Sequence, residues 1–121
     1  TLLLSLALFL PYGAGIPETV RKLAHITPMN NYERLEDMFK KHGDKFAAML
    51  IEPIQGNCCS IMAEVEYVRL ARELCTKYGV MLIIDEVKSG FRVGKSGIQG
   101  IMGVKPDITT FAKAVANPGQ R

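Results

Sequence analysis

Three ionisable side chains each follow a short apolar stretch of the chain. Glu52 comes directly after FAAMLI, Asp85 directly after VMLII, and Lys113 shortly after DITTF. Stretches of this kind are typical of strands in a parallel sheet, and ligands of such sheets bind beyond the carboxyl ends of the strands. A single charge after a strand usually only ends that strand in solvent. The joint placement of all three predicts that they meet at one edge of the sheet.

A lysine and a carboxylate at such an edge suit one particular cofactor chemistry. A lysine amine at the mouth of a cleft can form an imine with an aldehyde, which pyridoxal phosphate supplies. The pyridine ring of this cofactor draws electrons only while its nitrogen stays protonated, and a buried carboxylate opposite the nitrogen keeps it protonated. The sequence therefore predicts a pyridoxal phosphate site in which Lys113 carries the cofactor and Asp85 faces the ring nitrogen.

The elements that would position these residues alternate between strands and helices. Apolar residues at helical spacing predict a helix over about 32–42, capped by Asn30 or Asn31 and ended by Gly43. The run at 46–51 predicts a strand covered on both faces.

The second half of this pattern repeats the alternation. Residues 64–78 have the pattern of a core-facing helix that Gly79 ends in a left-handed conformation, and the run at 80–84 predicts the next strand. Strand, helix and strand make one right-handed crossover, so the sheet is expected to be mainly parallel. After a Gly-rich loop over 89–103, residues 107–111 predict a further strand.

The first 28 residues carry weaker signals. Residues 1–10 are apolar and could be the centre of a signal peptide, but no basic leader precedes them, and a buried piece of strand or helix is favoured. Five Pro and Gly residues in 11–28 indicate an irregular connection with at most a short helical turn. We therefore divide the chain into 1–28, an apolar start and irregular connection, and 29–121, part of a cofactor-binding domain.

Composition narrows the class of protein. The 121 residues carry a net charge of +3 with both signs scattered, so we expect no nucleic-acid partner. A stretch of ten residues is too short to span a bilayer, so no membrane partner is expected. The three cysteines fit neither a disulfide framework nor a metal site, which predicts reduced thiols, a cytoplasmic location and no metal.

Three motifs in order resemble the class III aminotransferases: EPIQGN at 52–57, LIIDEVKSGFR at 82–92 and GVKPDITTFAK at 103–113. Within that class the chain is similar to the glutamate-1-semialdehyde 2,1-aminomutase group. The resemblance implies an α/β fold, a fragment of the large domain of a fold-type-I pyridoxal-phosphate-dependent transferase, with a mainly parallel sheet and flanking helices. It also implies a homodimer and a small amino substrate, either an amino acid or an amino-aldehyde such as glutamate 1-semialdehyde.

The resemblance assigns roles to four residues. Lys113 would be the Schiff-base lysine and proton shuttle, Asp85 would pair with the pyridine nitrogen, Val87 would pack against the ring, and Asn57 would lie near the phenolic oxygen. Glu52 and Arg92 belong to the motifs as residues that shape the site, and Lys88 stands where many members carry glutamine or another neutral residue. Because other family segments are absent from these 121 residues, the fragment is expected to be inactive alone.

Two other interpretations compete with this one. LIIDE at 82–86 is similar to the magnesium-binding strand of a P-loop ATPase, but no phosphate-loop spacing accompanies it. The chain could also be a truncated, non-catalytic interaction fragment. A dinucleotide-binding domain is disfavoured because the spacing GxGxxG does not occur.

Overall fold

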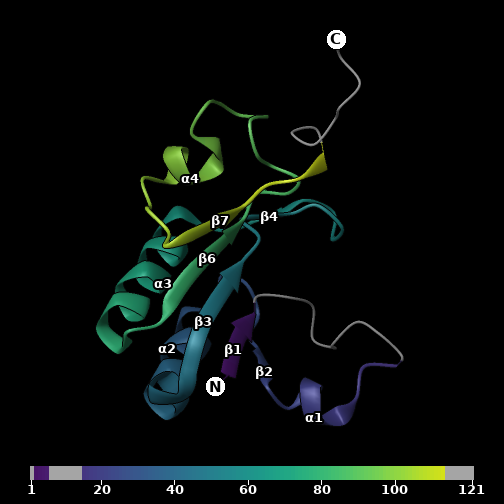
Figure 1. The fold of residues 1–121 in the computed structure, drawn as a ribbon. Helices are drawn as coiled ribbons and strands as arrows, with labels where there is room; N and C mark the ends of the chain where they lie inside the picture. Colours follow the sequence, from purple (N-terminus) through teal and green to yellow (C-terminus); the bar gives the residue numbers. More distant parts are fainter. Residues whose placement is uncertain (1, 6–14, 114–121) are drawn as a thin grey trace.

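A five-stranded parallel sheet organises the molecule. The structure is a computed structural model that describes residues 2–5 and 15–113. The strands follow the order β2-β1-β3-β6-β7, and each neighbouring pair is parallel. Helices flank this sheet (Figure 1), so the predicted α/β architecture with a mainly parallel sheet is confirmed. The strands are β1 (Leu2–Ser5), β2 (Ala24–Ile26), β3 (Phe46–Ile51), β6 (Met81–Asp85) and β7 (Ile108–Thr110).

Helix α2 (Tyr32–His42) has the predicted bounds and one of the two predicted caps. The side chain of Asn31 accepts a hydrogen bond from the Arg34 N–H at 2.8 Å. The end of the helix differs from the expectation, because Gly43 keeps a helical φ of −55° and continues into the 3₁₀ turn Gly43–Lys45. A β-carbon on Gly43 would lie 2.5 Å from Cδ1 of Tyr78, so close packing requires the glycine, not a left-handed turn.

Helix α3 (Val65–Tyr78) ends as predicted. Gly79 adopts a left-handed conformation with φ of 68°, and the Val80 N–H then donates to the Cys75 carbonyl at 2.8 Å. The apolar face of this helix buries Tyr67, Val68 and Cys75 completely. Burial raises the pKa of the Cys75 thiol to about 12, so this side chain is a neutral part of the core.

The two long helices cover one face of the sheet. Met49, Ile51, Leu82 and Ile84 alternate along β3 and β6, and each is fully buried in the same hydrophobic core as the helices. The residues between them are half-buried, and Figure 1 shows α2 and α3 on the same side of the sheet. Our expectation that β3 is covered on both faces is thus wrong for the described residues, because both long helices pack on one side.

Strand β2 and helix α4 were not expected from the sequence. Strand β2 lies inside the segment interpreted as an irregular connection, whose short helical turn is present as α1 (Glu18–Arg21). Strand β1 lies in the apolar start, where a strand or helix piece was favoured, and β1 and β2 pair with each other. The Gly-rich loop contains α4 (Gly97–Met102). The division of the chain at residue 28 stays a prediction.

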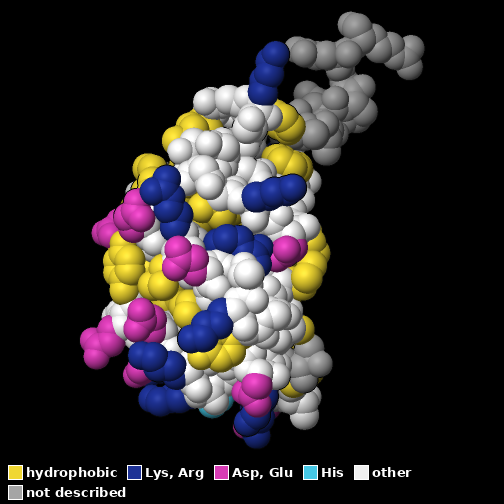
Figure 2. Space-filling view, turned by 90° about the vertical axis from the view of Figure 1, so that its left-hand side faces the viewer, with side chains coloured by type: hydrophobic (Ala, Val, Ile, Leu, Met, Phe, Trp, Pro, Cys, Tyr) yellow, Lys and Arg dark blue, Asp and Glu magenta, His cyan; other side chains and the backbone are white. Residues whose placement is uncertain are grey.

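The surface over the helices mixes both signs of charge. Figure 2 shows Lys and Arg interspersed with Asp and Glu on this face, in keeping with ion pairs along the helices such as Lys40–Glu36 at 3.3 Å. At its edge, Arg72 Nη1 lies 2.7 Å from Asp107 Oδ2, and the guanidinium lowers the pKa of that carboxyl. Within residues 2–5 and 15–113, every helix is too short or too polar to cross a membrane.

Candidate functional site

The three ionisable residues that follow the apolar runs lie at the carboxyl edge of the sheet. Glu52 comes directly after β3, Asp85 is the last residue of β6, and Lys113 lies three positions beyond the end of β7. Strand register aligns these ends, because Ile51 pairs with Ile84 and Asp85 pairs with Thr110. The parallel sheet thereby carries side chains from three distant parts of the sequence to one edge.

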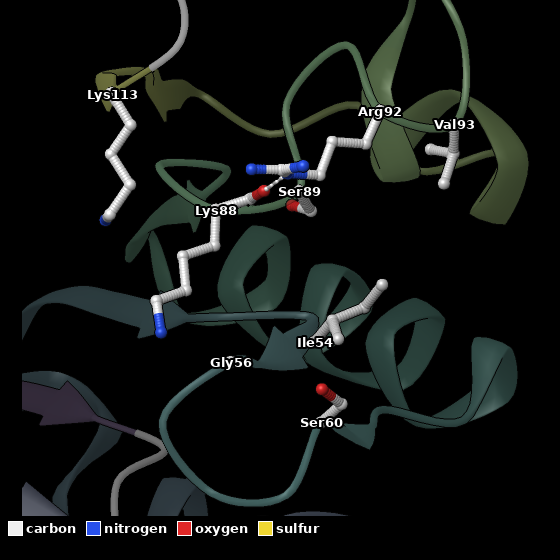
Figure 3. A pocket seen from close by; sticks show the side chains of 8 residues that line it. All are labelled: Ile54, Gly56, Ser60, Lys88, Ser89, Arg92, Val93 and Lys113. Atoms are coloured by element: carbon white, nitrogen blue, oxygen red, sulfur yellow. Dashed lines mark hydrogen bonds between the residues drawn. The ribbon is translucent and has the colours of Figure 1, made fainter.

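A pocket of about 410 Å³ opens at this edge, which is within the usual range for small-molecule sites. In Figure 3 the side chains of Lys88 and Lys113, which come from different elements, extend in the same direction along it. The residues that line it are Ile54, Gly56, Ser60, Lys88, Ser89, Arg92, Val93 and Lys113. Three of these are cationic and none is acidic, so this pocket favours a ligand that carries negative charge.

Lys113 is held in an unusual backbone conformation. Its φ is 58°, in the left-handed region that residues other than glycine rarely adopt. Near it, the buried hydroxyl of Thr110 has no hydrogen-bond partner among the described residues. Strained backbone and unpaired buried polar atoms cost stability and concentrate at functional sites. Both features mark the end of β7 as a candidate binding region.

Asp85 and Val87 are joined by a local hydrogen bond. The Val87 N–H donates to Asp85 Oδ1 at 2.8 Å, and Oδ2 of the same carboxylate has no hydrogen bond within the described part of the chain. Asp85 is half-buried, and neither residue is among those that line the pocket of Figure 3. The structure therefore places this pair at the same edge as Lys113, with one carboxylate oxygen left for a further donor.

Asn57 lies on the hairpin formed by β4 (Ile54–Gln55) and β5 (Ile61–Met62). The Gly56 N–H donates to Glu52 Oε1 at 3.1 Å, so the carboxylate at the end of β3 holds the turn of this hairpin. Asn57 in turn accepts a hydrogen bond from the ammonium group of Lys88. Glu52 thus contacts the turn that carries Asn57, and its role in shaping the site stays a prediction.

The loop after β6 joins Lys88 to the rest of the site. The Arg92 side chain donates from Nε to the backbone carbonyl of Lys88 at 2.6 Å, the dashed line in Figure 3. The Nε–H of Arg92 is therefore bonded within the loop that carries both residues. Arg92 consequently stabilises the segment that presents Lys88 to the pocket.

Sequence reasoning missed Glu86, which is 1% exposed. Its carboxylate accepts hydrogen bonds from Ser89 Oγ at 3.1 Å and from the N–H groups of Ile98 and Gln99, each at 3.0 Å. It therefore ties the start of α4 to the loop that carries Val87 and Lys88. Gly97, with φ of 63°, leaves room for this carboxylate, because a β-carbon there would overlap it, and no spacing in the sequence indicates the contact.

His25 and His42 are brought together by the fold although they lie apart in the sequence. Their ring centroids are 4.9 Å apart, and burial, with a smaller contribution from His42, lowers the pKa of His25. Over the described ranges, no group of three or more potential metal-ligating side chains forms.

Comparison with known proteins adds evidence that is independent of this geometry. The sequence is 45% identical to glutamate-1-semialdehyde 2,1-aminomutase from Caldivirga maquilingensis over 105 residues, covering 87% of this chain and 24% of that protein. It is 41% identical to the protein of the same name from Legionella pneumophila, with 91% and 26% covered. The chain thus spans about a quarter of the length of these curated relatives.

Solved transaminase structures share the fold. An omega-transaminase from Sphaerobacter thermophilus matches with a TM-score of 0.78 and 35% identity, over 84% of this chain and 23% of that one. A transaminase described as having PLP bound matches with a TM-score of 0.84 and 28% identity, over 95% of this chain and 31% of that one. The predicted fold, part of a PLP-dependent transferase domain, is confirmed.

The sequence model of the family described as "Aminotransferase class-III" matches residues 7–118, nearly the whole chain. This match overrides the P-loop ATPase interpretation of LIIDE. On the strength of these three comparisons, the chain belongs to the class III aminotransferase family.

Proposed function

We propose that this chain forms the ring-facing part of a pyridoxal phosphate site in an aminotransferase or aminomutase. The observation that carries the proposal is the position of Lys113, a strained lysine that lines a cationic pocket at the carboxyl edge of the sheet. Membership of the class III family supports it. So do the relatives, which bear the name of an aminomutase, and the solved transaminases.

The residues present fit the cofactor. The pocket combines a lysine amine for the aldehyde with cationic groups for negatively charged oxygens. Asp85 has a carboxylate oxygen without a partner in the described segments, which can accept a hydrogen bond from a protonated ring nitrogen. When bound, pyridoxal phosphate would supply an electron sink for bonds at the α-carbon of an amino substrate. Donors, acceptor and amine are therefore all of the required chemical types.

Each site residue then has a separate task. Lys113 would hold the cofactor's aldehyde through its amine and would also move a proton at the substrate α-carbon. Asp85 holds the proton on the ring nitrogen by its negative charge. Val87 packs against the ring, and Asn57 lies near the phenolic oxygen, as the resemblance implies. Glu52 and Arg92 hold the hairpin and the loop that carry these side chains.

The substrate class follows from the relatives and not from the pocket alone. We infer an amino acid or an amino-aldehyde similar to glutamate 1-semialdehyde, from the name shared by the two relatives described above. Because the chain spans a quarter of their length, we infer that it acts within a longer protein and is inactive alone. A homodimer and a cytoplasmic location stay predictions, and the molar mass in solution would test the first.

The test uses the complete protein that carries this chain. Purified with pyridoxal phosphate, it should show a visible absorption band of a protein-bound imine, and Lys113→Ala should abolish the band. Lys105→Ala is the matched control, because Lys105 is an exposed lysine beside a different hollow of the surface, and it should keep the band. A Lys113→Ala protein with an undiminished, borohydride-sensitive band would refute the assignment.

A further inference from the structure

A side-chain bridge crosses the pocket and joins two segments that are distant in the sequence. Lys88, on the loop after β6, donates from its ammonium group to Oδ1 of Asn57 on the β4–β5 hairpin. In Figure 3 the Lys88 side chain runs from its loop towards the hairpin backbone at Gly56. The bridge therefore links the wall that carries Ser89 and Arg92 to the wall formed by the hairpin.

This bridge determines which way the Asn57 amide faces. An amide side chain has a carbonyl oxygen that accepts hydrogen bonds and an NH₂ group that donates them, whereas an ammonium group only donates. Lys88 can bond only to the oxygen, so the oxygen is turned towards Lys88 and the NH₂ group is turned away. In the described part of the chain, that NH₂ group has no hydrogen-bond partner. Asn57 is exposed and does not itself line the pocket, but it adjoins the lining residue Gly56, so its NH₂ group is a donor at the pocket rim.

The charges around the bridge favour an anionic acceptor for this donor. Lys88, Arg92 and Lys113 line the pocket, and no carboxylate does. The nearby carboxylate of Glu52 accepts from the Gly56 N–H through Oε1 and is not among the groups that line the pocket. A negatively charged oxygen placed here would gain a charge-assisted hydrogen bond, which is stronger than a neutral one.

Gly56 makes room for the bridge. A β-carbon at this position would overlap Cδ of Lys88, and Gly56 has no positive φ that would otherwise require glycine. The stem of Lys88 therefore lies directly against the hairpin backbone. An alanine here would displace the flexible lysine side chain at little cost to the fold.

We propose that Lys88 is a positioning residue that orients the Asn57 amide, so that its NH₂ group receives an anionic oxygen of the bound ligand. This proposal rests on the proposed function, in which the ligand is pyridoxal phosphate. That ligand has two kinds of anionic oxygen, the phenolic oxygen and the phosphate. Both groups present a negatively charged oxygen, and the ligands used in the test distinguish the phenolic oxygen from the phosphate.

The experiment measures equilibrium binding to the complete protein that carries this chain. Three probes are compared: pyridoxal phosphate, pyridoxal without the phosphate, and the 3-O-methyl ether of pyridoxal phosphate, which lacks a phenolate. For each protein, the affinity for an analogue is divided by the affinity for pyridoxal phosphate. For one analogue this ratio should be about tenfold lower in the wild type than in the variants without the bridge, because only the wild type loses the charged hydrogen bond. The analogue that shows this lower ratio identifies the oxygen.

Three variants disturb the bridge in different ways. Lys88→Met removes the ammonium group. Gly56→Ala keeps Lys88 in the sequence but pushes its side chain away from Asn57. Both variants should therefore lose the tenfold preference. Asn57→Asp keeps an acceptor for Lys88 but has no NH₂ group, and it should bind the anionic ligand more weakly still. Lys95→Met is the control, because Lys95 is an exposed lysine outside the pocket lining, and it should preserve every ratio.

Binding ratios distinguish orientation from general structural damage, because a destabilised protein would bind all three ligands more weakly. The proposal would be overturned if Lys88→Met and Gly56→Ala had the same ratios of analogue affinity to pyridoxal phosphate affinity as the wild type. Failure of the proposed function would look different: no borohydride-fixed cofactor would be found on Lys113 in any of the proteins.

Discussion

The helix-covered core and the carboxyl edge of the sheet differ in burial and in backbone conformation. In the core, Phe39, Leu82 and Ile84 are fully buried in regular elements, Asn31 caps α2, and Gly79 ends α3 as predicted. At the edge, residues other than glycine adopt positive φ values. Four of the five such residues in the described segments lie there, in loops or at the end of β7: Cys59, Ser60, Phe91 and Lys113.

This difference separates what maintains the fold from what serves the ligand. Core residues agree with their local propensity, so they stabilise the structure. Edge residues adopt conformations that cost free energy and that only the surrounding contacts enforce. Substitutions in the core should therefore change stability, whereas substitutions at the edge should change binding and turnover.

The largest effect on stability is expected from Phe39→Ala. Phe39 is fully buried, and its ring lies 5.7 Å from that of Phe46 and 5.5 Å from that of Tyr78. Removing it should lower the free energy of unfolding by about 3–5 kcal/mol, measured by denaturant titration. Phe91→Ala is the matched edge variant, since Phe91 is 54% exposed, and it should cost about 1 kcal/mol or less. Equal losses of unfolding free energy in the two variants would contradict the difference between the core and the edge.

The next effect concerns turnover instead of stability. Asp85→Asn keeps the shape of the side chain but removes the charge that holds the ring proton. We expect kcat of the complete protein on the amino substrate proposed above to fall about 10²–10³-fold, as when one electrostatic stabiliser is removed. Pyridoxal phosphate should still bind and the melting temperature should change little. Near-normal turnover would mean that another group protonates the ring.

A pair of glycines isolates the contribution of Glu86. Gly97 and Gly79 have similar φ values of 63° and 68°, but a β-carbon overlaps the Glu86 carboxylate at Gly97 and meets open space at Gly79. Gly97→Ala should therefore destabilise the protein by about 1–3 kcal/mol more than Gly79→Ala, because it also disrupts the buried hydrogen bonds of Glu86. Thermal or chemical unfolding measures both, and similar losses would show that Glu86 adapts freely.

The smallest perturbation is chemical labelling of the cysteines. Cys75 is fully buried with its pKa raised to about 12, whereas Cys59 is exposed on the hairpin at the edge. Iodoacetamide at pH 8 should modify Cys59 in the folded protein and Cys75 only after unfolding, because the thiolate is the reactive form. Mass spectrometry of the peptides gives both rates. Fast labelling of Cys75 would indicate that the core opens readily.

Local signals were sufficient to predict the long elements and to state a hypothesis for the site. Apolar periodicity and capping residues predicted α2 and α3, and three ordered motifs pointed to Asp85 and Lys113. Strand β2 was missed because three residues form a strand only through pairing with β1. The roles of Glu86 and of the bridge from Lys88 to Asn57 depend on contacts between segments, which spacing along the chain does not reveal.

The central claim is that Lys113 carries the cofactor. The most direct measurement is borohydride reduction of the complete protein with pyridoxal phosphate, followed by digestion and mass spectrometry to find the modified lysine. We expect a pyridoxyl group on Lys113 and on no other lysine of residues 1–121. A pyridoxyl group on Lys88, or on a lysine elsewhere while Lys113 stays unmodified, would contradict it.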